Sequence, residues 1–187
     1  MTILALDTTS ARASLALRHD GVTLAQLTLD SADGYAHLIF QAIARLLADA
    51  AVQLHEIDCF ATASGPGSFT GVRVGLAAVK GLAAALGKPA VGISNLRALA
   101  SFGNLRPVID ARRGEVYTAV YDADLWLVSP ETVGPFTDLP ITPAPENLAA
   151  GVALCAEMDG PAGWQDPAAL DANYVRRADA ELFWKDS

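Results

Sequence analysis

The feature that most constrains the fold is a pattern that occurs twice in the chain, once around Asp7 and again around Asp110. In each copy an apolar, strand-like run ends in an aspartate, a short polar turn follows, and a second strand-like run begins. The first copy reads TILALD and then ASLALRH, and the second reads RPVID and then EVYTAVY. Self-similarity at a fixed interval indicates a repeated structural unit, so we predict two lobes of related fold.

The first copy continues into a regular series of strands and helices. A third strand follows Asp20-Gly21, which is a strong hairpin signal between two apolar runs. Helical periodicity then covers residues 35–52, a buried strand is expected at 57–64, and a second helix runs from about Val72 to Leu86. Three antiparallel strands followed by alternating helices and strands predict a mixed α/β layer structure.

The second copy is shorter than the first. Residues 125–133 stand where its third strand should lie, but from Thr137 onward the chain is rich in proline and no long amphipathic helix is expected. The boundary is expected near residues 101–105. We therefore predict two domains, with residues 1–102 carrying the helices and residues 103–187 forming a reduced second lobe.

Charge and composition exclude several classes of protein. The chain has 13 basic and 21 acidic residues, a net charge of −8, and no long basic run. Direct binding of RNA or DNA by this chain alone is therefore disfavoured, because clustered Lys and Arg drive such binding. No signal peptide and no membrane-spanning run of about 18 apolar residues is recognisable, which favours a cytoplasmic protein. Cys59 and Cys155 lack CxxC spacing and are expected to be buried, reduced thiols.

Residues 64–75 read SGPGSFTGVRVG, a glycine-rich loop before the second helix. The loop lacks the ending of a Walker A motif, and its third glycine falls one residue late for a dinucleotide fingerprint. A glycine turn before a helix N-terminus still suits an anion, and Thr70 is expected to cap that helix. Three interpretations stay open: a phosphate site, a tight turn, or a docking loop in which an exposed Phe69 contacts another protein.

The second helix carries two stripes. The first is apolar and is expected to face the lobe's own sheet: Val72, Leu76, Val79, Leu82 and Leu86. The other is small and uncharged: Val74, Ala78, Gly81 and Ala85. Glycine inside a helix costs about 1 kcal/mol relative to alanine and so usually has a packing reason. The second stripe is expected either to pack inside its own domain or to meet a helix of another subunit, and we favour the second.

Four segments together resemble the TsaB (YeaZ) family: LALDTTS, SGPGSFTGVRVG with the following KGLA, DARRGEVYTAVY and NYVRRADAELF. The resemblance runs nearly end to end, although the second lobe is shorter than expected for the family. It implies two ribonuclease-H-like lobes, as in actin, sugar kinases and Hsp70 ATPase domains. It also implies a bacterial subunit of the machinery that makes threonylcarbamoyladenosine in tRNA, supporting a catalytic paralogue, TsaD.

The metal chemistry of the paralogue is not expected here. TsaD resembles this chain in the first lobe but carries an H-x-x-x-H metal pair on its first helix. In this chain the matching positions are His37 and Gln41. One imidazole cannot build a metal site, so we expect no metal and interpret His37 as a surface or interface residue.

Nucleotide chemistry is likewise disfavoured. By resemblance, Asp7, Thr8 and Thr9 match the first phosphate loop of actin-like ATPases, here a vestigial loop in which Asp7 bonds its own turn. Arg112 and Arg113 in the matching turn of the second lobe are expected to crowd a nucleotide cleft. No Ser-His-Asp or Cys-His arrangement can be argued, so we assign no catalytic residue and no cofactor.

The sequence therefore predicts a non-catalytic scaffold subunit of a threonylcarbamoyltransferase complex acting on the adenosine 3′ of the tRNA anticodon. The expected partners are a TsaD-like paralogue, a TsaE-like small ATPase, tRNA only through the complex, and a second copy when the paralogue is absent. Two alternatives are an actin-like ATPase or phosphotransferase and a peptidase acting on the paralogue. The predicted partner-binding residues are His37, Gln41, Arg45, Ser68, Phe69, Thr70, Gly71, Val74, Ala78, Gly81 and Ala85.

Overall fold

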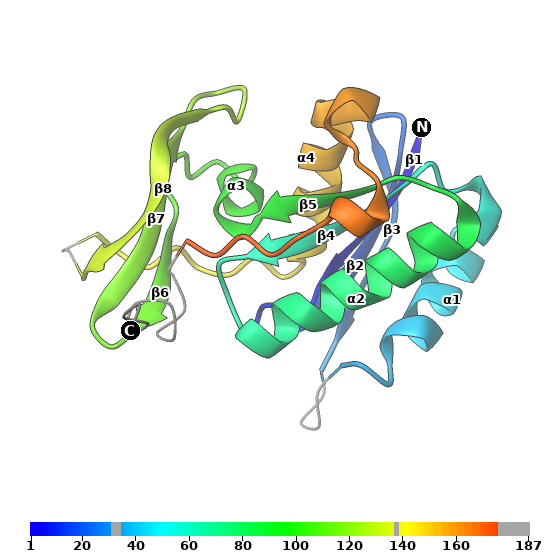
Figure 1. Ribbon diagram of the computed structural model, residues 1–187, viewed down its shortest axis with the longest axis horizontal. Helices are drawn as coiled ribbons and strands as arrows, with labels where there is room; N and C mark the ends of the chain where they lie inside the picture. The colour runs from blue at the N-terminus through cyan, green and yellow to red at the C-terminus, as the bar shows by residue number, and fades with distance from the viewer. Residues whose placement is uncertain (31–34, 137–138, 176–187) are drawn as a thin grey trace, which may run out of the picture.

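The computed structural model describes residues 1–30, 35–136 and 139–175 of the chain. Its larger part is built on a five-stranded sheet with the order β3-β2-β1-β4-β5 (Figure 1). The first three strands are antiparallel, and β4 and β5 continue the sheet in parallel with β1. This is the ribonuclease-H-like arrangement predicted for the first lobe. The bounds are Thr2–Asp7 (β1), Ala13–His19 (β2), Val22–Leu29 (β3), Cys59–Gly65 (β4) and Ala90–Ser94 (β5).

Helices cover both faces of this sheet (Figure 1). Helix α1 (Ile39–Asp49) packs against β2 and β3, and α2 (Phe69–Leu86) packs on the same face against β1 and β4. Helices α3 (Asn95–Ala100) and α4 (Leu148–Gly163) pack on the opposite face. The first lobe is therefore a three-layer structure with its sheet in the middle.

Strand β1 lies at the centre of both cores because its alternate side chains point to opposite faces of the sheet. Leu4 and Leu6 join the apolar cluster under α1 and α2, and Ile3 and Ala5 join the cluster under α3 and α4. All six residues of the strand are buried. The hairpin predicted at Asp20-Gly21 is confirmed, since both residues adopt the positive φ angles that a tight turn between β2 and β3 requires, +43° and +82°.

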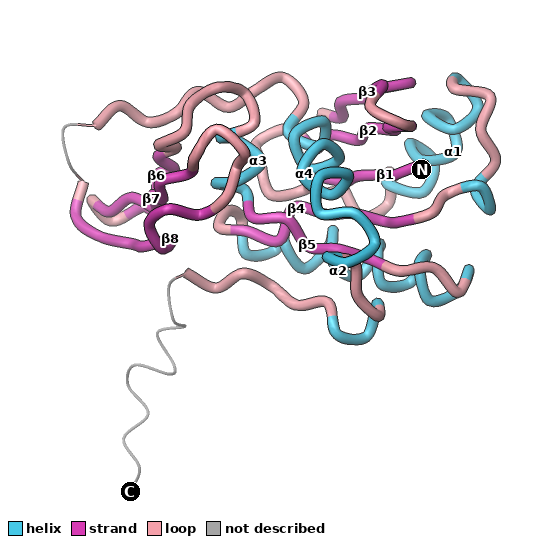
Figure 2. Tube along the Cα trace, turned by 90° about the horizontal axis from the view of Figure 1, so that it is seen from above, coloured by secondary structure: helices cyan, strands magenta, loops and turns pink. Residues whose placement is uncertain are grey.

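The second sheet contains three antiparallel strands in the order β6-β7-β8: Val108–Arg112, Glu115–Tyr121 and Leu127–Pro135. It lies to one side of the larger sheet (Figures 1 and 2). The predicted repeat is visible in detail, because Asp7 Oδ1 accepts a hydrogen bond from Thr9 N and Asp110 Oδ1 accepts one from Arg112 N, both at 2.7 Å. The two turns are thus built alike.

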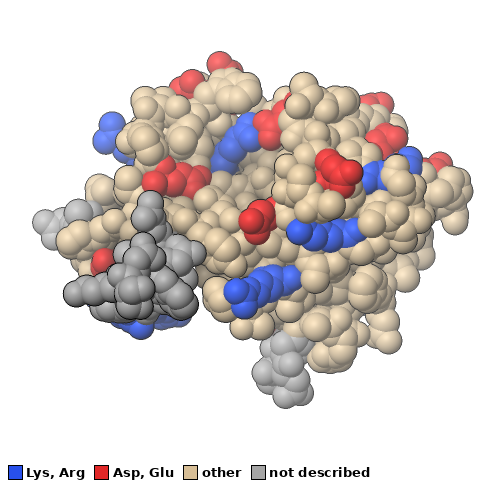
Figure 3. All heavy atoms as spheres, in the orientation of Figure 1, with Lys and Arg blue, Asp and Glu red and all other residues tan. Residues whose placement is uncertain are grey.

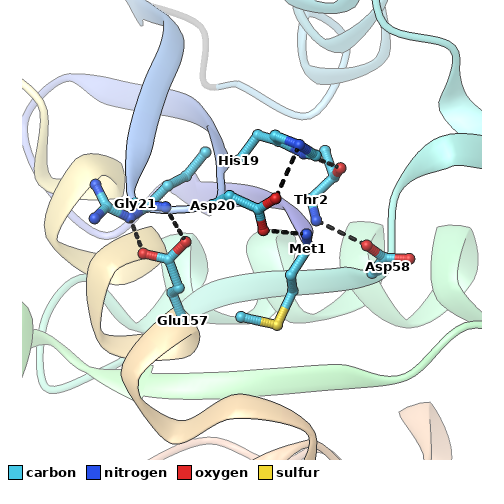
Figure 4. Close-up of polar contacts among 8 residues, drawn as sticks. Met1, Thr2, His19, Asp20, Gly21, Asp58 and Glu157 are labelled. Carbon is cyan, nitrogen blue, oxygen red and sulfur yellow. Dashed lines mark hydrogen bonds and ion pairs between the residues drawn. The ribbon is translucent and has the colours of Figure 1, made fainter.

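Helix α4 was not expected from the sequence. Its apolar residues surround most of its circumference, so it has little amphipathic periodicity, and its regular part ends at Gly160. The helix leaves the second sheet and packs against β1 and β2 of the first. Two ion pairs hold it there, Arg18 with Glu157 and Arg97 with Asp159. Figure 4 shows how Glu157 also accepts a hydrogen bond from the backbone of Gly21 in the β2–β3 hairpin.

The division at residue 102 stays a prediction. The chain after that residue forms the second sheet and then packs against the first sheet through α4 and the segment that follows it. Beyond α4, residues 164–174 run back along the edge of the larger sheet (Figure 2), and we call them the return segment. Gln165 pairs with Ala90 of β5 through two backbone hydrogen bonds of 2.9 Å. Asn173 N donates to Ser64 O at 2.8 Å, and the short helical turn η2 (Pro167–Ala169) contacts α2. The other 3-10 turn, η1 (Leu54–Glu56), precedes β4.

Candidate functional site

The glycine-rich loop packs tightly against the turn that follows β1. Thr8 Oγ1 donates to Gly71 O at 2.6 Å, and Ser68 N donates to Thr9 O at 3.1 Å. A Cβ atom added at Gly71 would overlap the carbonyl group of Thr8, and one added at Gly75 would lie 2.7 Å from Thr62 Oγ1. The glycines are therefore needed for close approach of two segments, which favours the tight-packing interpretation over a phosphate site.

The cap of α2 differs from the prediction. Ser68, not Thr70, is the N-cap residue, and its side-chain oxygen accepts a hydrogen bond from Gly71 N at 3.2 Å. Thr70 lies exposed in the first turn of the helix. The helix begins earlier than the predicted Val72 because the loop reaches the helical conformation at Phe69. Two of the amide groups near this helix start, those of Ser68 and Gly71, thus have protein partners.

Asp7 is fully buried at the point where the loop and the first turn meet. Its Oδ1 accepts hydrogen bonds from Thr9 N and from Thr9 Oγ1, at 2.7 and 2.6 Å, so it bonds its own turn as expected. Among the described residues, its Oδ2 has no hydrogen-bond partner. Burial raises the pKa of the Asp7 carboxyl above its ordinary value, although the bonds from Thr9 oppose this. Removal from water thus favours the neutral acid at this position.

A polar network continues from this turn toward the second sheet. Thr9 Oγ1 accepts a hydrogen bond from Asn95 Nδ2 at 2.5 Å, and Asn95 Oδ1 accepts one from Gly65 N at 3.0 Å. On the other side of Gly65, Asn173 of the return segment donates to Glu131 of β8 at 2.6 Å. The first turn, the glycine loop, the return segment and the second sheet are thereby linked.

A cleft of about 330 Å³ lies between the two aspartate turns, lined by Thr9, Asn95 and Asp110 among others. The sequence predicted that Arg112 and Arg113 would crowd it, and this is wrong, because neither arginine lines the cleft. The Arg112 side chain is 86% exposed and pairs with Asp110 at 3.3 Å. Residues 141–145 line the cleft instead, and this proline-rich segment offered no signal of such a position.

The predicted partner-binding residues separate into two groups in the structure. Most are exposed on α1, on α2 or on the segment just before each: His37, Gln41, Arg45, Ser68, Phe69, Thr70, Gly81 and Ala85, with Val74 half-buried. Gly71 and Ala78 are buried, Gly71 against the Thr8 carbonyl and Ala78 in the core beneath the two helices. These two therefore lie beneath the surface that the sequence assigned to a partner.

The same surface includes residues that sequence reasoning missed. On α2, Ala77 and Ala84 are exposed beside Gly81, and on α1, Ala44 and Ala48 are exposed beside Phe40, whose side chain is 57% accessible. The spacing of four between the α1 alanines was the available signal. We call the exposed residues Phe40, Ala44, Ala48, Thr70, Ala77, Gly81 and Ala85 the small-residue face.

Metal-ligating side chains and thiols are scattered in the part of the chain that the structure describes. There, no group of three or more His, Cys, Asp or Glu residues could hold a metal ion. Cys59 and Cys155 are buried free thiols, and burial raises their pKa to about 12 and about 11.

Helix α2 is long and apolar enough to cross a membrane by length and composition, but it packs along the sheet.

Comparison with known proteins agrees with this geometry. A family model described as TsaD: tRNA N6-adenosine threonylcarbamoyltransferase matches residues 30–140. The solved structure of YeaZ from Pseudomonas aeruginosa is 35% identical, with a TM-score of 0.66 over 75% of this chain and 70% of that one. The chain belongs to this family, and within it to the TsaB (YeaZ) group. A further Pseudomonas aeruginosa structure, described as similar to peptidase YeaZ, has a TM-score of 0.78 and 26% identity over 94% of this chain and 99% of that one.

Named TsaB proteins are longer than this chain. The tRNA threonylcarbamoyladenosine biosynthesis protein TsaB of Bacillus subtilis is 35% identical over 65% of this chain and 55% of its own length, and that of Escherichia coli is 36% identical over 66% and 56%. The chain thus spans about half the length of these TsaB relatives. An uncharacterised protein of Mycobacterium tuberculosis is 35% identical over 96% of this chain and 94% of its own length, so it is a relative of similar size.

Proposed function

We propose that this chain is a non-catalytic subunit that docks to a TsaD-like paralogue and supports the formation of threonylcarbamoyladenosine in tRNA. The names of its TsaB relatives support the pathway. The observation that carries the docking role is the small-residue face, which exposes uncharged side chains of two adjacent helices on one side of the sheet. Exposed apolar side chains grouped on two helices of one sheet face support a protein interaction site.

The small-residue face suits helix-to-helix contact. Alanine and glycine side chains let a second helix approach closely, and a Cβ atom added at Gly81 would meet nothing within 4 Å in this chain. A glycine with no internal packing reason in the middle of a helix costs about 1 kcal/mol relative to alanine. An external partner gives Gly81 such a reason. Phe40 offers the aromatic anchor that interfaces favour, with Gln41 and Arg45 as a polar rim.

The packing of the turn after β1 supports the non-catalytic role. This turn, residues 7–9, is the segment that resembles the phosphate loop of actin-like ATPases. The glycine loop occupies the space beside Thr8 and Thr9, and Asp7 is buried beneath it. A carboxyl group shielded from water in this way is poorly placed to hold a hydrated magnesium ion. The paralogue would supply the metal, the substrate site and the transfer step. A small TsaE-like ATPase joins the complex, and tRNA is held by the assembly rather than by this acidic chain.

The same face is expected to pair with a second copy of the chain when the paralogue is absent. A two-fold arrangement would place α1 and α2 of one copy against those of the other, and interfaces of this kind bury on the order of 1,600 Å². Heterodimer and homodimer would therefore compete for one surface. We expect the protein to act in the cytoplasm, where tRNA is modified.

The test combines binding with activity. The chain is mixed with the TsaD-like protein of the same organism, and association is followed by analytical ultracentrifugation while threonylcarbamoyladenosine is measured in tRNA. Gly81→Leu should abolish both signals in an intact fold. Ala123→Leu, an exposed alanine between β7 and β8, is the matched control and should leave both unchanged. Association that survives Gly81→Leu would refute the docking face, and full activity of the chain without a paralogue would refute the supporting role.

A further inference from the structure

A groove of about 720 Å³ runs between the C-terminal half of α2 and the return segment. Lys80 and Ala84 line it from the helix, Lys88 follows the helix end, and Trp164 and Pro167 line it from the return segment. Lys80 directly precedes Gly81, and adjacent residues of a helix point about 100° apart. The groove therefore borders the small-residue face, and the exposed Ala84 lies where the two surfaces meet.

The two lysines of the groove are unpaired within the described part of the chain. No carboxylate there lies within ion-pairing distance of Lys80 or Lys88. Asp166 also lines the groove, but its Oδ1 accepts a hydrogen bond from Ala168 N at 2.7 Å and caps the turn η2. Figure 3 shows basic side chains spaced along α2 on this face, with acidic side chains beside them. The charged residues that line the groove are thus two lysines and one aspartate, in a chain whose net charge is −8.

The rest of the groove is apolar and fixed in position. Trp164 Nε1 donates to Ala156 O at 3.0 Å, which anchors the indole, while Ala84 and Pro167 add aliphatic surface. Two cations beside an anchored aromatic ring match a ligand that carries carboxylates and an apolar side chain. A nucleic acid fits less well, because a phosphate backbone needs a longer run of cations than these two lysines provide.

We propose that this groove binds an acidic, partly apolar peptide segment of a partner protein. Carboxylates of the segment would pair with Lys80 and Lys88, and one of its apolar side chains would lie against Trp164. The groove borders the small-residue face at Ala84, so the segment would lie beside a partner helix bound to that face. The groove would thus add a second, charge-selective contact to the helix-docking contact proposed above. The two proposals are tested by different variants, so one can be refuted while the other stands.

The probe is a short synthetic peptide of alternating glutamate and leucine, with a glutamine and leucine peptide as its neutral counterpart. The full chain carries Trp126→Phe and Trp184→Phe, so that Trp164 alone of the three tryptophans reports binding by fluorescence. We expect a saturable change in emission with the acidic peptide only, weakened by added salt. Lys80→Ala with Lys88→Ala should weaken binding about tenfold, since each exposed ion pair contributes up to ~1 kcal/mol.

Arg106→Ala with Arg12→Ala removes two exposed cations away from the groove and is the charge-matched control, so it should leave peptide binding unchanged. Several results would overturn the proposal: no saturable signal, equal binding of the neutral peptide, or unaltered binding by the double lysine variant. Tighter, lysine-dependent binding of a single-stranded RNA of the same charge would assign the groove to nucleic acid. A change in self-association of the double lysine variant in ultracentrifugation would assign it to a second copy of the chain.

Discussion

Glu157 of α4 joins two elements of the first lobe at once, because its carboxylate accepts from Arg18 Nε at 2.5 Å and from Gly21 N at 2.7 Å (Figure 4). Both side chains of the ion pair are only 15% exposed. The contact ties a helix near the end of the chain to its first hairpin. It explains how α4 can leave the second sheet and still be held firmly on the first.

We predict that Glu157→Gln destabilises the protein by about 2 kcal/mol, because it leaves the shielded Arg18 guanidinium without its counter-charge. The measurement is the free energy of unfolding in urea. Asp49→Asn is the control, since it breaks the Arg45–Asp49 pair, whose side chains are 71% and 62% exposed. That change should cost less than about 0.5 kcal/mol. Equal effects of the two variants would show that α4 does not depend on Glu157.

The glycines of α2 are expected to respond in opposite ways to the same substitution. Gly71→Ala places a methyl group on the Thr8 carbonyl and should cost about 3 kcal/mol, because backbone on both sides has to move. Gly81→Ala meets nothing within 4 Å and should stabilise the helix by about 1 kcal/mol. Thermal unfolding followed by circular dichroism measures both. A stable Gly71→Ala variant would contradict the close packing of the loop.

Leucine at neighbouring positions of α2 should separate folding from association. Gly81→Leu should keep the fold and prevent dimer formation, because its new side chain points outward from the small-residue face. Ala78→Leu should instead damage the fold by about 1–3 kcal/mol, because Ala78 is only 8% exposed and lies in the core. Ultracentrifugation reports association, and urea unfolding reports stability. A Gly81→Leu variant that unfolds would mean that this flank packs inside the lobe.

Asp7 is expected to make stability fall as the pH rises. Its pKa is raised by burial in the folded state, so the folded protein holds a proton that the unfolded chain releases. The contribution of the neutral acid is complete below the unfolded pKa of about 3.8. It is lost progressively as the pH rises from there through the folded pKa.

Asp7→Asn removes this titration. The stability of the Asn variant relative to wild type should therefore improve as the pH rises, measured by urea unfolding at a series of pH values from mildly acidic to neutral. Asp110→Asn, at the exposed counterpart in the second aspartate turn, is the control and should show a smaller trend. A relative stability that stays constant with pH would contradict the predicted proton uptake by Asp7.

Much of the first lobe could be predicted from sequence because its signals are local. The hairpin at Asp20-Gly21, the end of α2 at Gly87 with φ +63°, and the buried strand β4 each depend on residues close together in the chain. Helix α4 could not be predicted in this way. A helix that is apolar on nearly all sides has no periodic signal of its own, and proline-rich sequence precedes it.

The candidate surface was predicted only in outline. The sequence predicted a small, uncharged flank of α2 from Val74, Ala78, Gly81 and Ala85, but it could not tell the buried Ala78 from the exposed Ala77. The two differ by one residue, and which of them is buried depends on how the whole helix is rotated on the sheet. The glycine loop was ambiguous for a similar reason, because its glycines are required by Thr8 and Thr9, which lie some sixty residues earlier in the chain.

The sequence by itself therefore determined the order of strands and helices through β5, the two aspartate turns and the lack of a long basic run. These follow from backbone preference, from side-chain periodicity and from the count of charges, which need no knowledge of distant contacts. Only the tertiary structure decided that Asp7 is shut away from water, that α4 returns to the first sheet, and that Lys80, Lys88 and Trp164 share a groove. Each of these depends on residues that are far apart in the chain and that only the packing of the core brings together.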